Sequence, residues 1–337
     1  MKSRGVRIAL SIAISALFLG FAVRGVHWDE AGAALRAANY WWVLAMLPVT
    51  VWSLFIRAQR WRVFLHAVGV PPLRPLVSAT NIGFLANMVL PLRIGEVVRP
   101  VLLSRMAKLP LSGVLASVLL ERIFDMFTIL FLFGLAASLV NVSDQVRQWG
   151  WMLSGLALAV AAVIVLIRLQ EKLALRIARG LANLLPGGLG DSAYGFAQGF
   201  VRALEMLDSP IAYLRAFGWS LYLWFVISLV YAFGFWAFHI DVPAVRGSLV
   251  LTTIVAIAVS VPSAPGFIGS FQLGCVLGLR IFGVDESAAI AYSLVVHLTQ
   301  FIGCIAAGLY SLWREGISLR DVENVKADDD EARDGQV

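Results

Sequence analysis

Charged side chains occur inside two apolar stretches of the sequence, around residues 93–99 and 121–125, and they are the residues best able to bind a ligand. A charge deep in a bilayer costs about 2.5–3.5 kcal/mol on insertion scales, so such side chains should face a protein interior or a wet cavity. On a helix, residues three or four positions apart share a face. The six candidate residues are Arg93, Glu96, Arg99, Glu121, Arg122 and Asp125.

Two interpretations of this charge cluster follow from its composition. In the first, it lines a polar chamber where Arg93 and Arg99 bind a lipid phosphate, because guanidinium binds phosphate oxygens through two hydrogen bonds. Glu96, Glu121 and Asp125 would then hold the arginines or receive a cationic headgroup. In the second, the cluster is an internal ion-pair network that fixes helix geometry alone.

Catalytic templates are missing from the sequence. It contains no P-loop, no G-x-S-x-G, no H-E-x-x-H and no C-x-x-C, which disfavours ATP-driven transport by this chain alone. Cys275 and Cys304 both lie in apolar stretches and are expected to be core residues. We therefore predict no catalytic residue, no metal site and no cofactor, and a transporter rather than an enzyme.

The composition predicts an all-α polytopic membrane protein without a separate soluble domain. Of the 337 residues, 60% are hydrophobic and 14% are charged, and the mean hydropathy is +0.82. No basic stripe interleaved with aromatic residues occurs, so nucleic acid is not an expected partner. Seven acidic residues fall within 321–337, which predicts a disordered cytoplasmic tail after one membrane domain over 1–320.

Six apolar stretches are long enough to span a bilayer, which takes about 20 residues. The first follows a basic N-terminus and is expected to be a retained signal anchor. Lys and Arg between the stretches predict that both termini lie in the cytoplasm of a cytoplasmic (inner) membrane protein. Arg57, Arg60 and Arg62 are expected to anchor the second span at the headgroups, with recruitment of lipid as the alternative. The six predicted spans cover residues 8–26, 39–57, 112–140, 150–168, 213–238 and 287–313.

Two further apolar regions, Pro75–Met106 and Ser248–Phe282, are interrupted by proline and glycine and are predicted to be re-entrant hairpins. The segment 91–96 matches 265–270 in the spacing of Pro, Ile and Gly, and the two hairpins face opposite sides. This pattern is typical of inverted-repeat transporters with binding sites at broken helices. The predicted hairpin and gating positions are Pro91, Gly95, Pro262, Pro265, Gly266 and Gly269.

Two polar residues of the last span, His297 and Gln300, follow the second hairpin at roughly the distance at which Glu121 follows the first. They are candidates for a proton or polar relay. A satisfied hydrogen bond between helices is an equal alternative.

Three motifs in combination give the sequence a family resemblance. They are N-M-V-L-P-L-R-I-G-E-V-V-R at 87–99, E-R-I-F-D at 121–125 and P-S-A-P-G-F-I-G at 262–269. The sequence resembles the lysylphosphatidylglycerol synthase transmembrane, or flippase-like, family. The resemblance implies transfer of aminoacylated phosphatidylglycerol between leaflets, or a link to polyprenyl- or dolichol-phosphate glycolipids, and it favours the charged residues above and the Pro265–Gly266 hairpin as functional positions.

The family's bifunctional members add a cytosolic aminoacyltransferase domain, whereas this chain ends in a short acidic tail, so we do not expect it to make lysyl-lipid by itself. We predict a flippase for a phospholipid or polyprenyl-phosphate-linked glycolipid whose acyl chains stay in the bilayer. The alternatives are a transferase or other component of polyprenyl-phosphate glycolipid synthesis, and a non-transporting scaffold of an envelope-assembly complex. Expected partners are membrane lipids and an envelope glycosyltransferase or lipid synthase.

Overall fold

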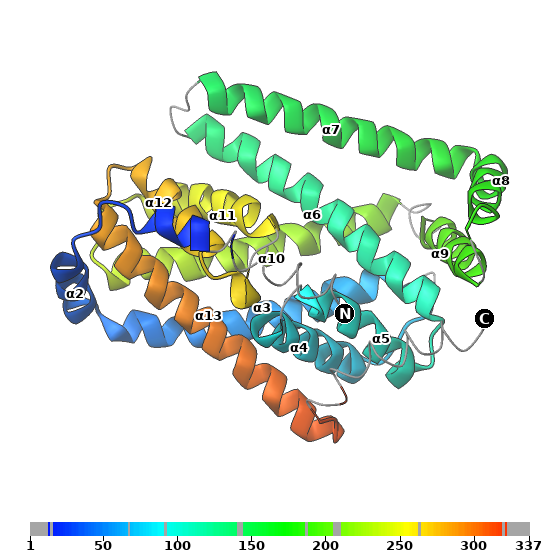
Figure 1. Ribbon diagram of the computed structural model, residues 1–337, viewed down its shortest axis with the longest axis horizontal. Coiled ribbons are helices and arrows are strands. Elements are labelled where there is room, and N and C mark those ends of the chain that lie inside the picture. Colours follow the sequence, from blue (N-terminus) through cyan, green and yellow to red (C-terminus); the bar gives the residue numbers. More distant parts are fainter. Residues whose placement is uncertain are drawn as a thin grey trace.

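The described part of the chain is helical throughout in the computed structural model (Figure 1). The structure describes residues 13, 16–66, 68–90, 93–139, 144–185, 188–204, 210–261, 264–318 and 321. Pro91, Pro262, the start of the first predicted span and all but Asp321 of the acidic tail lie outside these residues. The helices are α2 (Trp28–Ala37), α3 (Tyr40–Phe64), α4 (Leu73–Val89), α5 (Gly95–Ala107), α6 (Leu111–Leu139), α7 (Asp144–Leu169), α8 (Glu171–Ala182), α9 (Leu189–Leu204), α10 (Pro210–Ala237), α11 (Ala244–Ser260), the short 3-10 helix η3 (Pro265–Phe267), α12 (Ser270–Arg280) and α13 (Glu286–Glu315).

Three described helices are long and apolar enough to cross a membrane: Tyr40–Phe64, Ile211–Ala237 and Glu286–Glu315. They confirm three of the predicted spans, those at 39–57, 213–238 and 287–313. The spans predicted at 112–140 and 150–168 form α6 and α7, and α6 carries the charged E-R-I-F-D segment. That these two helices and the first span cross the bilayer stays a prediction.

Both interrupted regions form helical hairpins, as their proline and glycine content predicts. The first hairpin consists of α4 and α5, which pack against each other, and the second consists of α11 and α12, with η3 between them. Gly95 begins α5 so close to α4 that a β-carbon on it would overlap the carbonyl oxygen of Gly83. Gly266 has a φ of +66°, which is costly for other residues. Re-entry of the hairpins into the bilayer stays a prediction.

Two four-helix units with the same order of elements build the core: α3 to α6, and α10 to α13. Helix α3 packs against α10, α4 packs against α13 and α11 packs against α6. Likewise, α3 packs against α13 and α10 against α6. Each hairpin therefore lies against the last helix of the other unit, and exchanging the two units leaves this set of contacts unchanged. We call the two units the first and second repeats.

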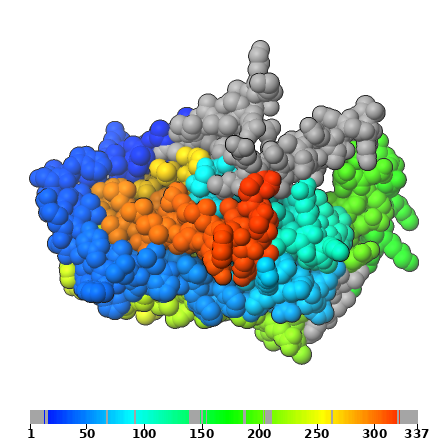
Figure 2. Space-filling view, turned by 90° about the horizontal axis from the view of Figure 1, so that it is seen from below, coloured from blue at the N-terminus to red at the C-terminus, as the bar shows by residue number. Residues whose placement is uncertain are grey.

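Helices α7, α8 and α9 lie outside the two repeats, although α9 packs against α6 and buries Leu204 in the apolar cluster of the first repeat. Figure 1 shows α7 running beside α6, with α8 and α9 at one end. Helix α8 is amphipathic, with Leu173, Ile177 and Leu181 exposed along one stripe. On the face shown in Figure 2, the orange-red α13 lies across the blue and cyan segments of the first repeat.

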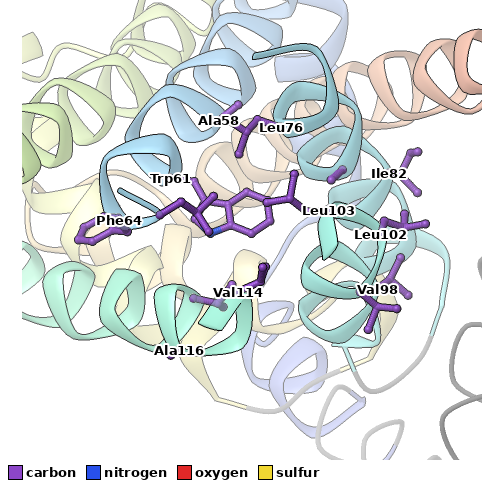
Figure 3. Close-up of a cluster of buried hydrophobic side chains, with 14 of the residues drawn as sticks. Ala58, Trp61, Phe64, Leu76, Ile82, Val98, Leu102, Leu103, Val114 and Ala116 are labelled. Carbon is purple, nitrogen blue, oxygen red and sulfur yellow. The ribbon is translucent and has the colours of Figure 1, made fainter. Parts of the chain in front are cut away.

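A cluster of buried apolar side chains joins the helices of the first repeat (Figure 3). Trp61 is fully buried among Leu76 of α4, Leu103 of α5 and Val114 of α6. Its indole N–H donates to the Ser117 hydroxyl at 2.9 Å, so its polar atom is also satisfied. Helix α3 therefore continues as a packed helix beyond residue 57, where the sequence predicted the span to end at the membrane surface.

We expect Gly95→Ala to lower the free energy of unfolding by about 1–3 kcal/mol, as overpacking does. The added methyl group would meet the backbone of Gly83 and the Asn87 side chain. Thermal unfolding of the detergent-solubilised protein measures the effect. The control is Gly134→Ala, where a β-carbon has open space on the same type of element. Equal melting temperatures for the two variants would contradict the close approach of α4 and α5.

Candidate functional site

Arg60 of α3 lies at the centre of a buried ion-pair network. Its side chain has no solvent exposure, and its Nη2 lies 2.8 Å from Oε1 of Glu121. Its Nη1 lies 2.5 Å from Oδ1 of Asp125 and also donates to the Ser220 hydroxyl of α10 at 3.3 Å. One guanidinium therefore joins both carboxylates of α6 and contacts the second repeat.

Arg99 of α5 reaches one of these carboxylates, that of Glu121, from the hairpin. Its Nη1 and Nη2 donate to Oε1 and Oε2 of Glu121 at 3.2 and 2.9 Å, and its guanidinium carbon lies 3.9 Å from the ring centroid of Trp61. Arg122 donates to Glu121 at 3.1 Å and lies 3.4 Å from Asp125, while 42% of its side chain stays exposed. Three arginines therefore neutralise two carboxylates, which are buried or nearly so.

The structure brings together four of the six predicted charges, namely Arg99, Glu121, Arg122 and Asp125. It also corrects one interpretation, because Arg60 lies in the network and not at the headgroups. The two acidic residues on α6 were the sequence feature that could have indicated Arg60 as their partner, since two buried carboxylates need cations from other helices. In the sequence, Arg60 follows an apolar stretch that ends at residue 57, a position typical of the membrane surface.

Arg93 makes different contacts and joins the two hairpins. Its Nη2 donates to the carbonyl oxygens of Val259 and Val261, the latter at 3.1 Å, and its guanidinium lies 4.9 Å from the ring centroid of Phe267. The last carbonyls of a helix have no partner within the helix, so a cation there satisfies the end of α11. Arg93 itself has a φ of +52°. The tip of the first hairpin therefore caps a helix of the second.

A polar cavity of about 300 Å³ lies between the two repeats and touches the network. Its walls come from α3, α4, α5 and α6 on one side and from α10, α11, η3, α12 and α13 on the other. Arg99, Arg60 and Glu121 lie behind this wall and do not line it. The polar and charged side chains that do line it are Thr50, Ser53, Arg57, Asn87, Arg93, Glu96, Arg122, Asp125, Tyr231, Thr252, Ser260, His297 and Gln300, with the Trp224 indole beside them.

Arg57 is the most informative of these lining residues. Its guanidinium stacks over Phe84, with 4.9 Å from its carbon to the ring centroid. It forms no close ion pair with a described carboxylate, and Asp125 of the same cavity wall attracts it over a longer distance. Glu96, which also lines the cavity, likewise makes no ion pair with any described residue. Arg57 therefore borders the space between the two repeats, and its role as a headgroup anchor stays a prediction.

His297 connects α13 to the second hairpin. The Gln272 amide donates to its Nδ1 at 2.9 Å, and its Nε2–H donates to the carbonyl of Gly266 at 2.7 Å. The ring also stacks on Phe271 with centroids 4.4 Å apart. These contacts fit the alternative of a satisfied hydrogen bond between helices. They join α12 to α13, as the Arg99–Glu121 pair joins α5 to α6 in the first repeat. The relay role of His297 and Gln300 stays a prediction.

Comparison with models of known families matches the lysylphosphatidylglycerol synthase transmembrane region over residues 8–308. The chain belongs to this family. The predicted resemblance is confirmed, and the match includes both hairpins, the ion-pair network and the cavity. Family membership and the apolar helices together establish a transmembrane protein.

The chain is also similar to a curated protein, glycosyltransferase AglD of Haloferax volcanii. The two are 25% identical over 355 residues, which cover 94% of this chain and 56% of that protein. The chain therefore spans little more than half the length of this relative. No solved structure matches the chain.

We expect Arg60→Met to destabilise the protein by about 3–5 kcal/mol, because removing one partner of a buried pair leaves an uncompensated charge. The unbranched Met side chain retains much of the packing, so the loss reports on charge. Chemical or thermal unfolding in detergent measures it. Adding Glu121→Gln and Asp125→Asn should restore part of the lost stability.

The matched control is Arg36→Met on the exposed end of α2, which should change the stability by less than about 0.5 kcal/mol. If Arg60→Met proves as mild as this control, Arg60 does not neutralise the carboxylates of α6.

Proposed function

We propose that this chain carries an anionic, phosphate-bearing lipid between the leaflets of the cytoplasmic membrane, either a phospholipid or a polyprenyl-phosphate-linked glycolipid. The observation that carries the proposal is the guanidinium of Arg57, which borders the cavity and forms no close ion pair with any described carboxylate. A buried cation is costly until an anion neutralises it. A phosphate group offers oxygens that a planar guanidinium binds in pairs.

The balance of charge in the cavity wall supports an anionic ligand. Arg57, Arg93 and Arg122 line it, against the carboxylates of Glu96 and Asp125. The network behind the wall adds two further arginines and one glutamate, so cations stay in excess. In this proposal Arg57 and Arg122 bind the phosphate, whereas the buried arginines position the wall.

Glu96 and Asp125 face the same space and would receive a cationic headgroup. This division refines the predicted site. Arg99, first considered a phosphate ligand, becomes a residue that holds Glu121 and packs on Trp61.

The two repeats suggest how the site reaches both leaflets. The proposed topology has six spans, two oppositely oriented re-entrant hairpins and both termini in the cytoplasm. A cavity between two exchangeable repeats, at the tips of two broken helices, supports alternating access by motion of one repeat against the other. Gly95, Pro265, Gly266 and Gly269, together with the prolines at 91 and 262, would allow the hairpins to bend.

We expect Arg57→Gln to slow leaflet exchange of anionic lipids at least tenfold, because a hydrogen bond to a charged group contributes about 1.5–3 kcal/mol. Reconstitution in liposomes with a panel of fluorescent phospholipids and polyprenyl phosphates measures exchange. The control is Arg62→Gln, on the same helix but outside the cavity wall. The control variant should transport at the wild-type rate.

Absence of exchange by the wild-type protein across the whole panel would overturn the transport proposal. Equal rates for Arg57→Gln and the wild type would remove Arg57 from the binding site. Size-exclusion profiles and melting temperatures of the variants separate these outcomes from misfolding.

A second candidate is a transferase, or another membrane component, of polyprenyl- or dolichol-phosphate glycolipid synthesis. The relative named a glycosyltransferase and the cavity carboxylate of Glu96 favour it. If the purified protein forms a product from a lipid-linked sugar and the Glu96→Gln variant does not, the result would support this candidate over the carrier. A protein that exchanges lipids without forming product would exclude it.

A further inference from the structure

A second cavity, of about 200 Å³, lies between α6, α7 and α11. Its apolar lining consists of Met126, Ile129, Leu130 and Phe133 from α6, Leu156 from α7 and Ile257 from α11. Ser260 adds a hydroxyl group, which donates to the carbonyl of Ala256 at 2.7 Å within its own helix. The lining thus offers almost nothing that would hold water, and dry apolar cavities bind apolar groups.

The two cavities adjoin. Ile129 of α6 and Ser260 of α11 line both of them, so the polar space and the apolar one share a wall at these residues. Along α6 the lining changes from Arg122 and Asp125 to apolar residues that end at Phe133. At 1.5 Å per residue, Asp125 and Phe133 lie about 12 Å apart along the helix. This sequence of charged and then apolar walls matches a lipid with its phosphate at one end and hydrocarbon beyond it.

Helix α7 borders the apolar cavity on one side without closing it. Leu156 lines the cavity and is 57% exposed, and Ile257 of α11 is 39% exposed, so the cavity opens at the surface of the molecule. In Figure 1, α7 lies along α6 at the edge of the molecule. The exposed apolar face of α7 suits hydrocarbon, so a lipid chain can enter the cavity beside this helix directly from the bilayer.

We propose that the apolar cavity receives one hydrocarbon chain of the lipid whose phosphate contacts Arg57 and Arg122. The inference rests on the proposed function and sharpens it, since the chain enters the protein and does not stay wholly in the bilayer. An engineered cavity of about 150 Å³ holds one benzene molecule, so about 200 Å³ has room for a segment of one chain and not of two. The site therefore selects lipids that present a single chain next to the phosphate.

Photolabelling tests the chain position directly. The probe is an alkyl phosphate with a diazirine at the chain end, added to the full-length protein in detergent. We expect labelled peptides from α6, α7 and α11, with labelling competed by polyprenyl phosphate but not by inorganic phosphate at equal concentration. Labels confined to other helices would overturn the inference. This test uses the unaltered protein and does not depend on any variant.

A filling variant tests the cavity itself. Ile257→Trp should reduce binding of the alkyl phosphate at least tenfold and leave binding of a short-chain phosphate ester unchanged. The control Leu158→Trp places the same ring on the outer face of α7 and should bind both probes as the wild type does. Unchanged binding of the alkyl phosphate in a folded Ile257→Trp protein would overturn the inference.

Arg57→Gln distinguishes this inference from the proposed function. If Arg57→Gln weakens both probes but Ile257→Trp weakens neither, the phosphate site stands and the chain site fails. If Arg57→Gln weakens neither probe, the phosphate site of the proposed function fails.

Discussion

The neutralisation of two carboxylates on α6 is the constraint on which the rest of the first repeat depends. Glu121 is fully buried and Asp125 is only 6% exposed, so cations from elsewhere in the chain must neutralise them. Arg60 supplies one from α3 and Arg99 supplies another from the hairpin. Each ion pair fixes the position of a helix, and the close contact of Gly95 with α4 then fixes the hairpin. The wall of the polar cavity follows from these contacts.

The second repeat also joins its hairpin to the helix that follows, but it does so without an ion pair. Where the first repeat joins its hairpin to the following helix through arginine and glutamate, the second uses the Gln272 amide and the His297 ring. A neutral contact on one side and an arginine-rich network on the other make the cavity electrostatically asymmetric. Its charged groups lie on the wall of the first repeat, and the second repeat contributes hydroxyls, an imidazole and aromatic rings.

Sequence patterns predicted the features that depend on local chemistry. Proline and glycine marked the breaks, and spacing on α6 placed Glu121 and Asp125 on one face. Partners distant in sequence were harder to predict. Arg60 looked like a surface anchor because positive charge at the end of a span is usually solvated, and only the packing of Trp61 shows that α3 continues into the core. The contact of Arg93 with α11 depends on tertiary structure, which no spacing reveals. The spans predicted at 112–140 and 150–168 form helices. The charged residues within α6 lower the hydropathy of that helix, so its composition indicates a membrane span less clearly.

The contacts of Arg93 also have a kinetic consequence. One side chain of the first hairpin holds the last carbonyls of a helix in the second, so the hairpin tips cannot separate until these hydrogen bonds break. Hydrogen bonds of a charged donor contribute about 1.5–3 kcal/mol each, and a barrier of that size slows a rearrangement by about one to two orders of magnitude per bond. Arg93 thus acts as a latch, and the speed at which the repeats can rearrange depends on a side chain that need not touch the transported molecule.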